Sequence, residues 1–178
     1  ARDTRVLLIA GGADFFSNGI HLNCIEAASY REDDSAADES MRNIEAMDDL
    51  AEAVIRTTDR LTIALLRGNA GAGGAFLALA ADEVWAHRGV VLNPHYKNMG
   101  NLYGSEYWTY LLPRRIGDGL TARLTGPPFT PIGTRHAVEI GLIDAAFGTD
   151  AAAFTAQTRA IARRIAANRD LGHKLEEK

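Results

Sequence analysis

Short apolar runs recur along the chain and predict a set of buried strands. Leucine and β-branched residues are concentrated at positions 5–10 (RVLLIA) and 61–66 (LTIALL), with shorter runs at 83–86 and 90–92. Runs of this length and composition are typical of strands buried on both faces, and we expect this of the first strand in particular.

Helical spacing is clearest from Met41 to Ile55, where apolar residues recur every three or four positions and charges lie on the other face. The acidic segment 30–39 before it is expected to be a solvated connection or the start of this helix. A glycine-rich turn at 68–74 opens a second helix, AFLALAAD, which is apolar nearly all round and must therefore be central. Further helices are expected at 105–112, 119–124, 132–139 and 151–168.

Strands that alternate with helices predict an α/β domain with short parallel crossovers. The 178 residues are 47% hydrophobic and show no linker, so we expect one domain over 1–178. Because the chain begins at Ala1 and reaches its first strand by Arg5, we also expect it to be a piece of a longer protein.

Charge and cysteine content exclude several classes of function. The net charge of -4 provides no basic field for nucleic acid or anionic lipid. The apolar runs are far shorter than the roughly 20 residues that cross a bilayer, so no membrane is expected as a partner. Cys24, the single cysteine, cannot form an internal disulfide, and no signal segment precedes the first strand, which predicts a cytoplasmic protein.

The glycine-rich turn is the first candidate for chemistry. A phosphate-binding P-loop would need Lys at Gly74, and a dinucleotide fingerprint would need a glycine at Phe76, so both are excluded. A helix N-terminus remains, at which Gly71, Gly73 and Gly74 leave backbone N–H groups uncovered. Close helix packing is the alternative explanation of these glycines.

A second loop, residues 16–22 (FSNGIHL), follows a buried strand directly and therefore lies at the end of the sheet, where ligands of α/β folds usually bind. Backbone N–H groups from two such loops can converge on a carbonyl oxygen and stabilise the negative charge that develops there.

Four segments resemble the crotonase (enoyl-CoA hydratase/isomerase) family: RVLLIAGGADFFSNGIHL, GNAGAGGAFLALAADEVWAH, LLPRRIG and AVEIGLIDAAF. The resemblance covers essentially the whole chain. It implies a crotonase-like (ClpP/crotonase) α/β fold, in which a β-β-α spiral core is covered by C-terminal helices.

The resemblance also implies roles for individual residues. The N–H groups of Ile20 and Gly73 would form an oxyanion hole for an acyl-CoA thioester. Asn18, Gly19 and His21 would contact the adenine end of coenzyme A, although the family has Asp where His21 stands. Gly74 is a further expected contact.

Two departures from the family bear on the reaction. Hydratases of this family use two glutamates, and by alignment these fall on Phe76 and, within one residue, on Tyr96. Because Phe cannot transfer a proton, hydration by the two-glutamate route is not expected.

Segment 93–110 (NPHYKNMGNLYGSEYWTY) resembles, more specifically, the C-terminal domain of the HypX/HoxX family of hydrogenase maturation factors. In that family an N-terminal region, which resembles formyltetrahydrofolate-dependent formyltransferases, passes a formyl group to coenzyme A. The crotonase-like domain then releases carbon monoxide for the CO ligand of a nickel-iron hydrogenase.

Dense polar groups in this segment, beside an expected apolar cleft, are candidates for proton transfer. We expect Tyr96 and Glu106 to be catalytic and the pKa of Glu106 to be raised by its aromatic neighbours, with a surface carboxylate as the alternative. Lys97 and Tyr103 are expected to contact coenzyme A, although a solvated lysine is equally consistent.

Other residues of the segment have structural explanations. A buried aromatic stripe explains Tyr107 and Tyr110, and a helix N-cap explains Ser105. The five histidines and Cys24 show no metal-ligand spacing, so no metal is expected.

The expected function is therefore release of CO from formyl-CoA by a lyase-like domain. Two alternatives stay open: another acyl-CoA enzyme, of hydrolase or isomerase type, or a non-catalytic CoA-binding module. Expected partners are the N-terminal formyltetrahydrofolate-binding region and other hydrogenase maturation proteins. Because crotonases often form trimers, a homo-oligomer is also an expectation, unless a large attached region prevents it.

Overall fold

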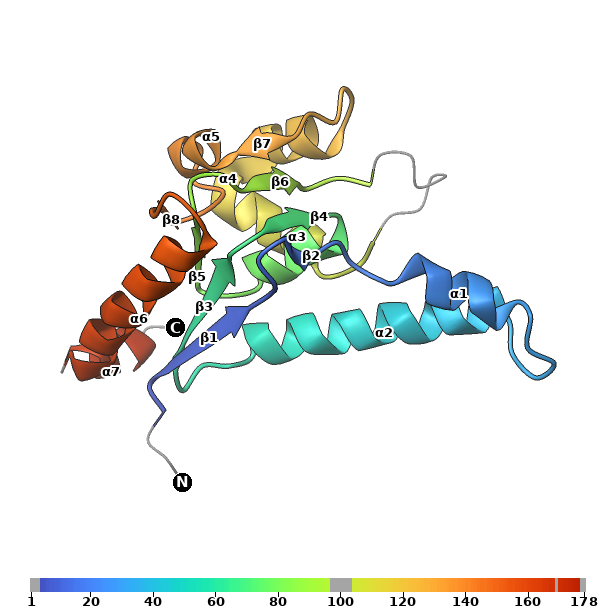
Figure 1. Ribbon diagram of the computed structural model, residues 1–178, viewed down its shortest axis with the longest axis horizontal. Helices are drawn as coiled ribbons and strands as arrows, with labels where there is room; N and C mark the ends of the chain where they lie inside the picture. The colour runs from blue at the N-terminus through green and yellow to red at the C-terminus, as the bar shows by residue number, and fades with distance from the viewer. Residues whose placement is uncertain (1–3, 97–103, 169, 177–178) are drawn as a thin grey trace.

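Two short sheets form the centre of the molecule, and successive turns of the chain add strands to both (Figure 1). The computed structural model describes residues 4–96, 104–168 and 170–176. One sheet has the order β1 (Val6–Ala10), β3 (Leu61–Leu66), β5 (Glu83–Ala86), β8 (Ala145–Ala146), all parallel.

The second sheet has the order β2 (Phe15–Ser17), β4 (Asn69–Gly71), β6 (Val91–Asn93), β7 (Ile132–Gly133). Its first three strands are parallel, and β7 runs antiparallel to β6. Each of the first three turns of the chain thus supplies one strand to each sheet and then continues into helix, which confirms the expected β-β-α spiral.

The helices are α1 (Leu22–Ala28), α2 (Ala36–Ile55), α3 (Gly73–Leu79), α4 (Trp108–Thr125), α5 (Thr134–Glu139), α6 (Ala151–Ala167) and α7 (Leu171–Glu176). All seven residues of α3 are buried, so the helix expected to be central does lie in the core. It contacts both sheets as well as α2 and α4. A second cluster, Ile63, Leu65, Trp85 and Phe154, lies between the first sheet and α6.

Helix α2 begins where its sequence provides a cap. The Ser35 hydroxyl accepts a hydrogen bond from the Asp38 N–H at 3.1 Å, and Asp38 and Glu39 place negative charge in the first turn. Arg42 then bridges Asp34 and Glu39, at 2.6 Å from each carboxylate. The acidic segment before Met41 is therefore a connection followed by the helix start, as expected.

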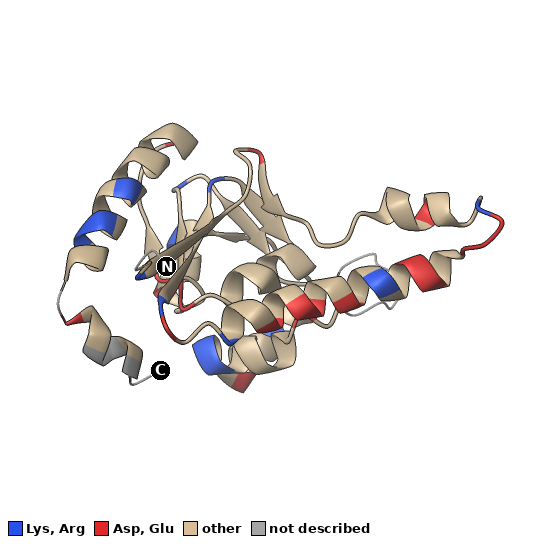
Figure 2. Ribbon diagram, turned by 90° about the horizontal axis from the view of Figure 1, so that it is seen from below, with Lys and Arg blue, Asp and Glu red and all other residues tan. Residues whose placement is uncertain are grey.

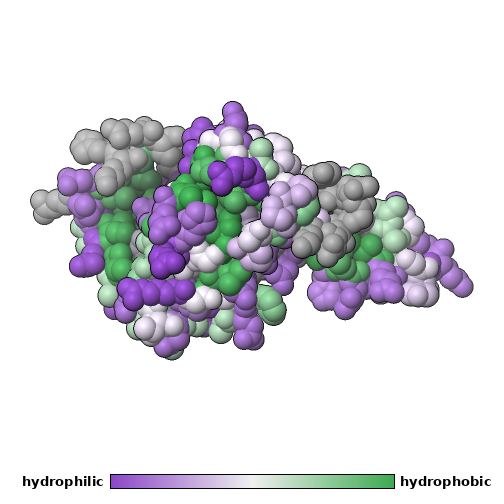
Figure 3. Space-filling model, turned by 90° about the horizontal axis from the view of Figure 1, so that it is seen from above, coloured by the Kyte–Doolittle hydropathy of each residue, from purple (hydrophilic) through white to green (hydrophobic). Residues whose placement is uncertain are grey.

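The pair α1–α2 projects beyond the sheets as an arm (Figure 1). Seen from above, this part of the surface has apolar areas among hydrophilic ones (Figure 3), and Leu22 and Met41 are 52% and 56% exposed. Acidic residues lie along α2, with Arg42 among them, whereas the charged residues of α6 are all arginines (Figure 2). No helix of the described part of the chain is long and apolar enough to span a membrane.

Several expectations about local structure were wrong. Strand β1 is not buried on both faces, because it is the outer strand of its sheet and Leu7 is 37% exposed. Helix α4 begins at Trp108 rather than at Ser105, since Glu106 and Tyr107 adopt positive φ angles of 24° and 54°. Ser105 is consequently not an N-cap, and its hydroxyl oxygen is buried without a hydrogen-bond partner among the described residues.

The expected aromatic stripe is also absent from the core. Tyr107 and Tyr110 are 39% and 48% exposed, and Arg114 lies over the Tyr110 ring at 5.0 Å. Tyr103 lies outside the described residues. Regular helical spacing does not extend through this segment, because the positive φ angles at 106 and 107 break it.

Candidate active site

The loop after β2 and the turn that opens α3 lie against each other. A Cβ atom added to Gly19 would lie 3.3 Å from the Gly73 nitrogen, so the two backbones are in close contact. Gly19 has φ +87°, a conformation that favours glycine, and its N–H donates to the Ser17 hydroxyl at 3.1 Å. The Ala72 N–H donates to the Asn93 carbonyl at 2.9 Å and ties the turn to β6.

Two backbone N–H groups are available at this junction. Gly73 is the first residue of α3, so its N–H has no acceptor within the helix, whereas those of Ala75 and Phe76 reach the Ala72 carbonyl. Among the described residues, the N–H of Ile20 also has no acceptor. Donors fixed by the backbone in this way can hold an oxygen on which negative charge develops.

Tyr96, which is half-buried, and Glu106, which is buried, form a hydrogen-bonded pair beside the junction. The Tyr96 hydroxyl donates to Glu106 Oε2 at 2.5 Å, and Glu106 is only 5% exposed, which excludes the surface alternative for this carboxylate. The Tyr96 and Phe76 ring centroids are 5.5 Å apart, and Trp108 stacks on Phe76 at 6.0 Å. The Trp108 indole N–H donates to the Gly104 carbonyl at 3.0 Å and holds the turn that carries Glu106.

The second oxygen of Glu106 faces the oxyanion candidate. A Cβ added to Gly73 would lie 2.2 Å from Glu106 Oε1, so no larger residue fits between them. The Glu106 carboxylate therefore has one oxygen on the Tyr96 phenol and the other beside the turn that carries the Gly73 N–H.

Burial sets the protonation behaviour of this pair. It raises the pKa of Glu106, the Tyr96 hydrogen bond opposes the rise, and the negative charge of Asp48 adds to it. The pKa of Tyr96 is raised by burial and by Glu106, so the phenol remains a proton donor at neutral pH. The pKa of Glu106 is thus raised, as expected, with burial as the largest cause.

A cavity of about 210 Å³ joins these groups. Its lining brings together six of the expected site residues: Asn18, Gly19, Ile20, Gly73, Tyr96 and Glu106. The remaining lining residues are Leu22, Ile25, Ser40, Ile44, Ala72 and Gly104.

Four expected site residues are not part of this lining. Lys97 and Tyr103 lie outside the described residues. His21 is exposed and precedes α1. A Cβ added to Gly74 would lie 2.1 Å from the Ser17 carbonyl oxygen, so the structural role of this glycine is the close packing that was the alternative explanation.

Sequence patterns did not indicate the contribution of α1 and α2 to the cavity. Ile44 belongs to the apolar face of the helix predicted from Met41 to Ile55, but the pattern does not say what that face covers. Gly104 was not predicted to line the site. Its place in the sequence, between Tyr96 and Glu106, is the one feature that could have indicated it.

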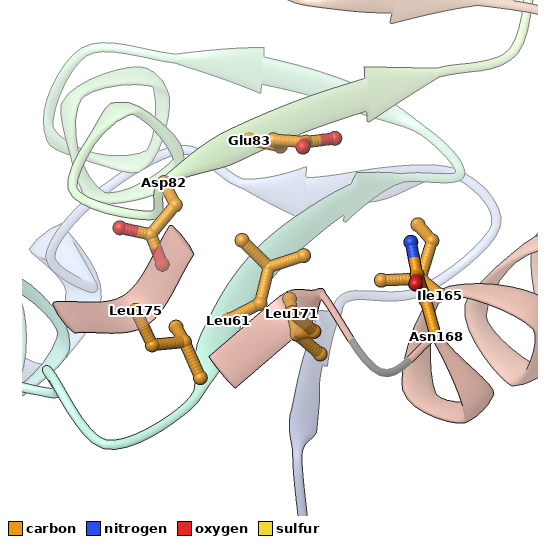
Figure 4. Close-up of a pocket in the computed structure, with 7 residues that line it drawn as sticks. All are labelled: Leu61, Asp82, Glu83, Ile165, Asn168, Leu171 and Leu175. Carbon is orange, nitrogen blue, oxygen red and sulfur yellow. The ribbon is translucent and has the colours of Figure 1, made fainter. Parts of the chain in front are cut away.

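A larger cavity, of about 340 Å³, lies elsewhere (Figure 4). Leu61, Leu171 and Leu175 line it, together with Asp82 and Glu83 at the start of β5. Asp82 accepts hydrogen bonds from the Thr62 backbone and hydroxyl at 2.7 Å, so this carboxylate supports the strands. None of the expected site residues lines this cavity, and we assign the site to the smaller one.

Within residues 4–96, 104–168 and 170–176, no group of three or more His, Cys, Asp or Glu side chains is arranged to hold a metal ion. The site described above consists of backbone amides, one phenol and one carboxylate.

Comparison with known proteins decides the family. Residues 1–177 match the family described as enoyl-CoA hydratase/isomerase. The chain belongs to the crotonase family. An enoyl-CoA delta isomerase 3 of Arabidopsis thaliana is 26% identical over 92% of the chain and 67% of its own length. An enoyl-CoA hydratase of Bacillus anthracis, 24% identical, shares the crotonase fold with a TM-score of 0.76 over 94% of this chain and 61% of its own.

More similar relatives are hydrogenase maturation factors. Over 85% of its length, this crotonase chain is 59% identical to the hydrogenase maturation factor HoxX of Bradyrhizobium diazoefficiens. It matches crystal structures of HypX from Aquifex aeolicus with TM-scores of 0.90 and 0.88 at 47% and 48% identity over 97% of the chain, and the second is a complex with tetrahydrofolic acid. The chain spans 26% of HoxX and about 30% of HypX.

The family segments in the C-terminal part of this crotonase have a structural role. Arg115, in LLPRRIG, donates to the Asp144 carboxylate at 3.0 Å and to the Ala81 carbonyl at 2.9 Å. Asp144, in AVEIGLIDAAF, also accepts from the Val84 N–H at 2.7 Å. These contacts hold α4 against the core, and none of the residues that make them lines the cavity.

Proposed function

We propose that this chain binds a coenzyme A thioester at the cavity beside Tyr96 and Glu106 and releases carbon monoxide from formyl-CoA. The observation that carries the proposal is the Tyr96–Glu106 pair, joined at 2.5 Å in the cavity that Ile20 and Gly73 also line. The 59% identity to HoxX over 85% of the chain supports a role in hydrogenase maturation.

The amides would bind the thioester oxygen. Negative charge that accumulates on this oxygen would be stabilised by the N–H groups of Ile20 and Gly73, and removal of one such donor typically costs about 10²–10³-fold in rate. Asn18 and Gly19 line the same cavity, and with His21 we assign them to the adenine end of the substrate.

Glu106 and Tyr96 would carry out the two proton transfers of the reaction. Glu106 Oε1 takes the formyl proton, and the electron pair of that C–H bond stays on carbon as the C–S bond breaks with its pair on sulfur. Tyr96 protonates the departing thiolate and regains a proton from Glu106. One formyl-CoA thus gives one CO and one coenzyme A thiol, and neither an oxidant nor a reductant is needed.

Hydration by two glutamates is not available to this site. Phe76 occupies one glutamate position, is completely buried and lies against the Tyr96 ring at a tilt of 33°. An aromatic ring there can neither add nor remove a proton of water. The Phe76 ring covers one side of the Tyr96 ring. Exclusion of water there suits a reaction in which water is not added to the substrate.

The formyl group has to come from another part of the maturation system. We propose that the chain works with a formyltetrahydrofolate-binding region, because a HypX relative was crystallised with tetrahydrofolic acid and is about three times as long as the segment matched here. Contact with other hydrogenase maturation proteins is part of the same proposal.

The test is to supply the purified protein with formyl-CoA and to capture CO with a reduced haem protein. We expect CO in proportion to enzyme. Tyr96→Phe and Glu106→Gln are each expected to reduce the rate by about 10²–10⁴-fold while CoA still binds. Tyr110→Phe, on an exposed phenol in α4, is the matched control.

Other products would identify the alternatives. Formate instead of CO would indicate a thioester hydrolase, and turnover of enoyl-CoA substrates would indicate an isomerase. CoA binding without turnover of any thioester would indicate a binding module. If the folded wild type yields no CO above buffer, the proposed reaction is wrong.

A further inference from the structure

Asp48, on α2, lies close enough to the Tyr96–Glu106 pair for its charge to act on both groups. It has no function in the reaction described so far. Ser40 and Ile44 line the cavity from α2, and Asp48 is the next residue on the same face of this helix, because side chains four positions apart lie above one another. The helix therefore directs Asp48 to the same side as the cavity, one turn further along.

The next turn of α2 meets the segment that carries Glu106. Burial raises the pKa of Tyr107, and the charges of Glu52 and Asp48 add to the rise. Glu52 is four residues beyond Asp48, so two successive turns of α2 face residues 106 and 107.

One oxygen of the Asp48 carboxylate has no hydrogen-bond donor in the part of the chain that the structure describes. This atom, Oδ1, is buried. A buried polar atom without a hydrogen-bond partner is costly, and such atoms in native proteins call for an explanation. Asp49, the next residue of α2, is exposed to solvent, unlike the Oδ1 atom of Asp48.

We propose, on the basis of the proposed function, that Asp48 is a positioning residue of the reaction, whose negative charge keeps the transferred proton on the Tyr96–Glu106 pair. It does not touch substrate. Its role is to make the Glu106 carboxylate a stronger base towards the formyl proton.

The direction of the effect follows from the charges that face Glu106. The titratable groups acting on it in the described structure are Tyr96, which lowers its pKa by hydrogen bonding, and Asp48, which raises it. Arg56, at the end of α2, acts on Tyr107 in the opposite sense to Glu52 and Asp48. Removal of the Asp48 charge therefore lowers the pKa of Glu106 and weakens it as a base.

The experiment compares Asp48→Asn with Asp49→Asn, which makes the same change of charge on the exposed side of the helix. The pH profile of kcat/KM for CO release is expected to have an acid limb, because Glu106 must be deprotonated to act. In D48N this limb is expected to move to lower pH, with a lower plateau rate, whereas D49N keeps the wild-type profile. Equal profiles for D48N and D49N would overturn the proposal.

A second measurement does not depend on turnover. In protein labelled with ¹³C at the glutamate carboxyl carbons, Glu106→Gln identifies the Glu106 resonance, and its titration is followed in wild type and D48N. A midpoint that moves to lower pH supports the proposal even if formyl-CoA is not the substrate, and an unchanged midpoint rejects it. Asp48→Ser serves in the same way if D48N does not fold.

Discussion

Gly104 lies directly against the Tyr96 phenol, so that a Cβ added to this glycine would be 1.9 Å from the phenol oxygen. The same Cβ would be 2.3 Å from Glu106 Oε2. The hydrogen bond between the two side chains thus passes over a position at which only glycine fits.

Replacement of this glycine by alanine is expected to separate the pair. In Gly104→Ala the added methyl group displaces the phenol, the carboxylate or both, and CO release is expected to fall by about 10²-fold or more. The measurement is the haem assay for CO, with a thermal unfolding curve to show that the protein is folded. Gly119→Ala is the control, because a Cβ at that position of α4 meets no atom within 4 Å; equal activity of the two variants would contradict the arrangement.

The raised pKa of Glu106 predicts a pH dependence of stability. The folded protein holds this proton more tightly than the unfolded chain, in which the pKa is near its ordinary value of 4.5. The stabilisation by the protonated form is therefore complete below pH 4.5 and is lost as the pH rises through the raised pKa.

Glu106→Gln removes this dependence. From pH 4.5 upward, the free energy of unfolding of E106Q is expected to rise relative to that of the wild type, as measured by denaturant titration at a series of pH values. A difference between the two proteins that does not change with pH would show that Glu106 titrates in the folded state as it does in the unfolded one.

The cluster between the first sheet and α6 is expected to be important for stability. Phe154 is completely buried and packs on Phe147 with ring centroids 4.9 Å apart. Phe154→Ala should lower the free energy of unfolding by about 3–5 kcal/mol. Phe15→Ala, on a side chain that is 54% exposed, should change it by about 0.5 kcal/mol or less. A loss below about 1 kcal/mol for F154A would indicate that α6 does not contribute to the cooperative fold.

Much of the fold could be predicted from the sequence, because its central elements have strong local signals. The run LTIALL forms β3 with the predicted bounds, and the helix predicted from Met41 to Ile55 is the larger part of α2. Strands β4, β7 and β8 have two or three residues each and no periodicity of their own. They exist because neighbouring strands pair with them, which a single sequence does not show.

The backbone amides and the side chains of the site were predicted from different kinds of signal. The amide-bearing turns could be located because glycine is required where backbones approach closely, as at Gly19 and Gly73. Tyr96 and Glu106 were predicted from the family resemblance and from their polarity, and the structure places them together. The aromatic stripe failed because the strained turn at Glu106 interrupts the helix that the spacing implies.

The order β2–β4–β6 has a consequence for how reactions diversify on this scaffold. Ile20, Gly73 and Tyr96 each follow one of three neighbouring strands, so their mutual offsets derive from the ladder between strands, about 4.8 Å per step. Hydrogen bonding between the main chains of the strands sets these distances, and it does not depend on which side chains the loops carry. Evolution can therefore exchange the acid and base of such an enzyme without having to rebuild the dimensions of its pocket.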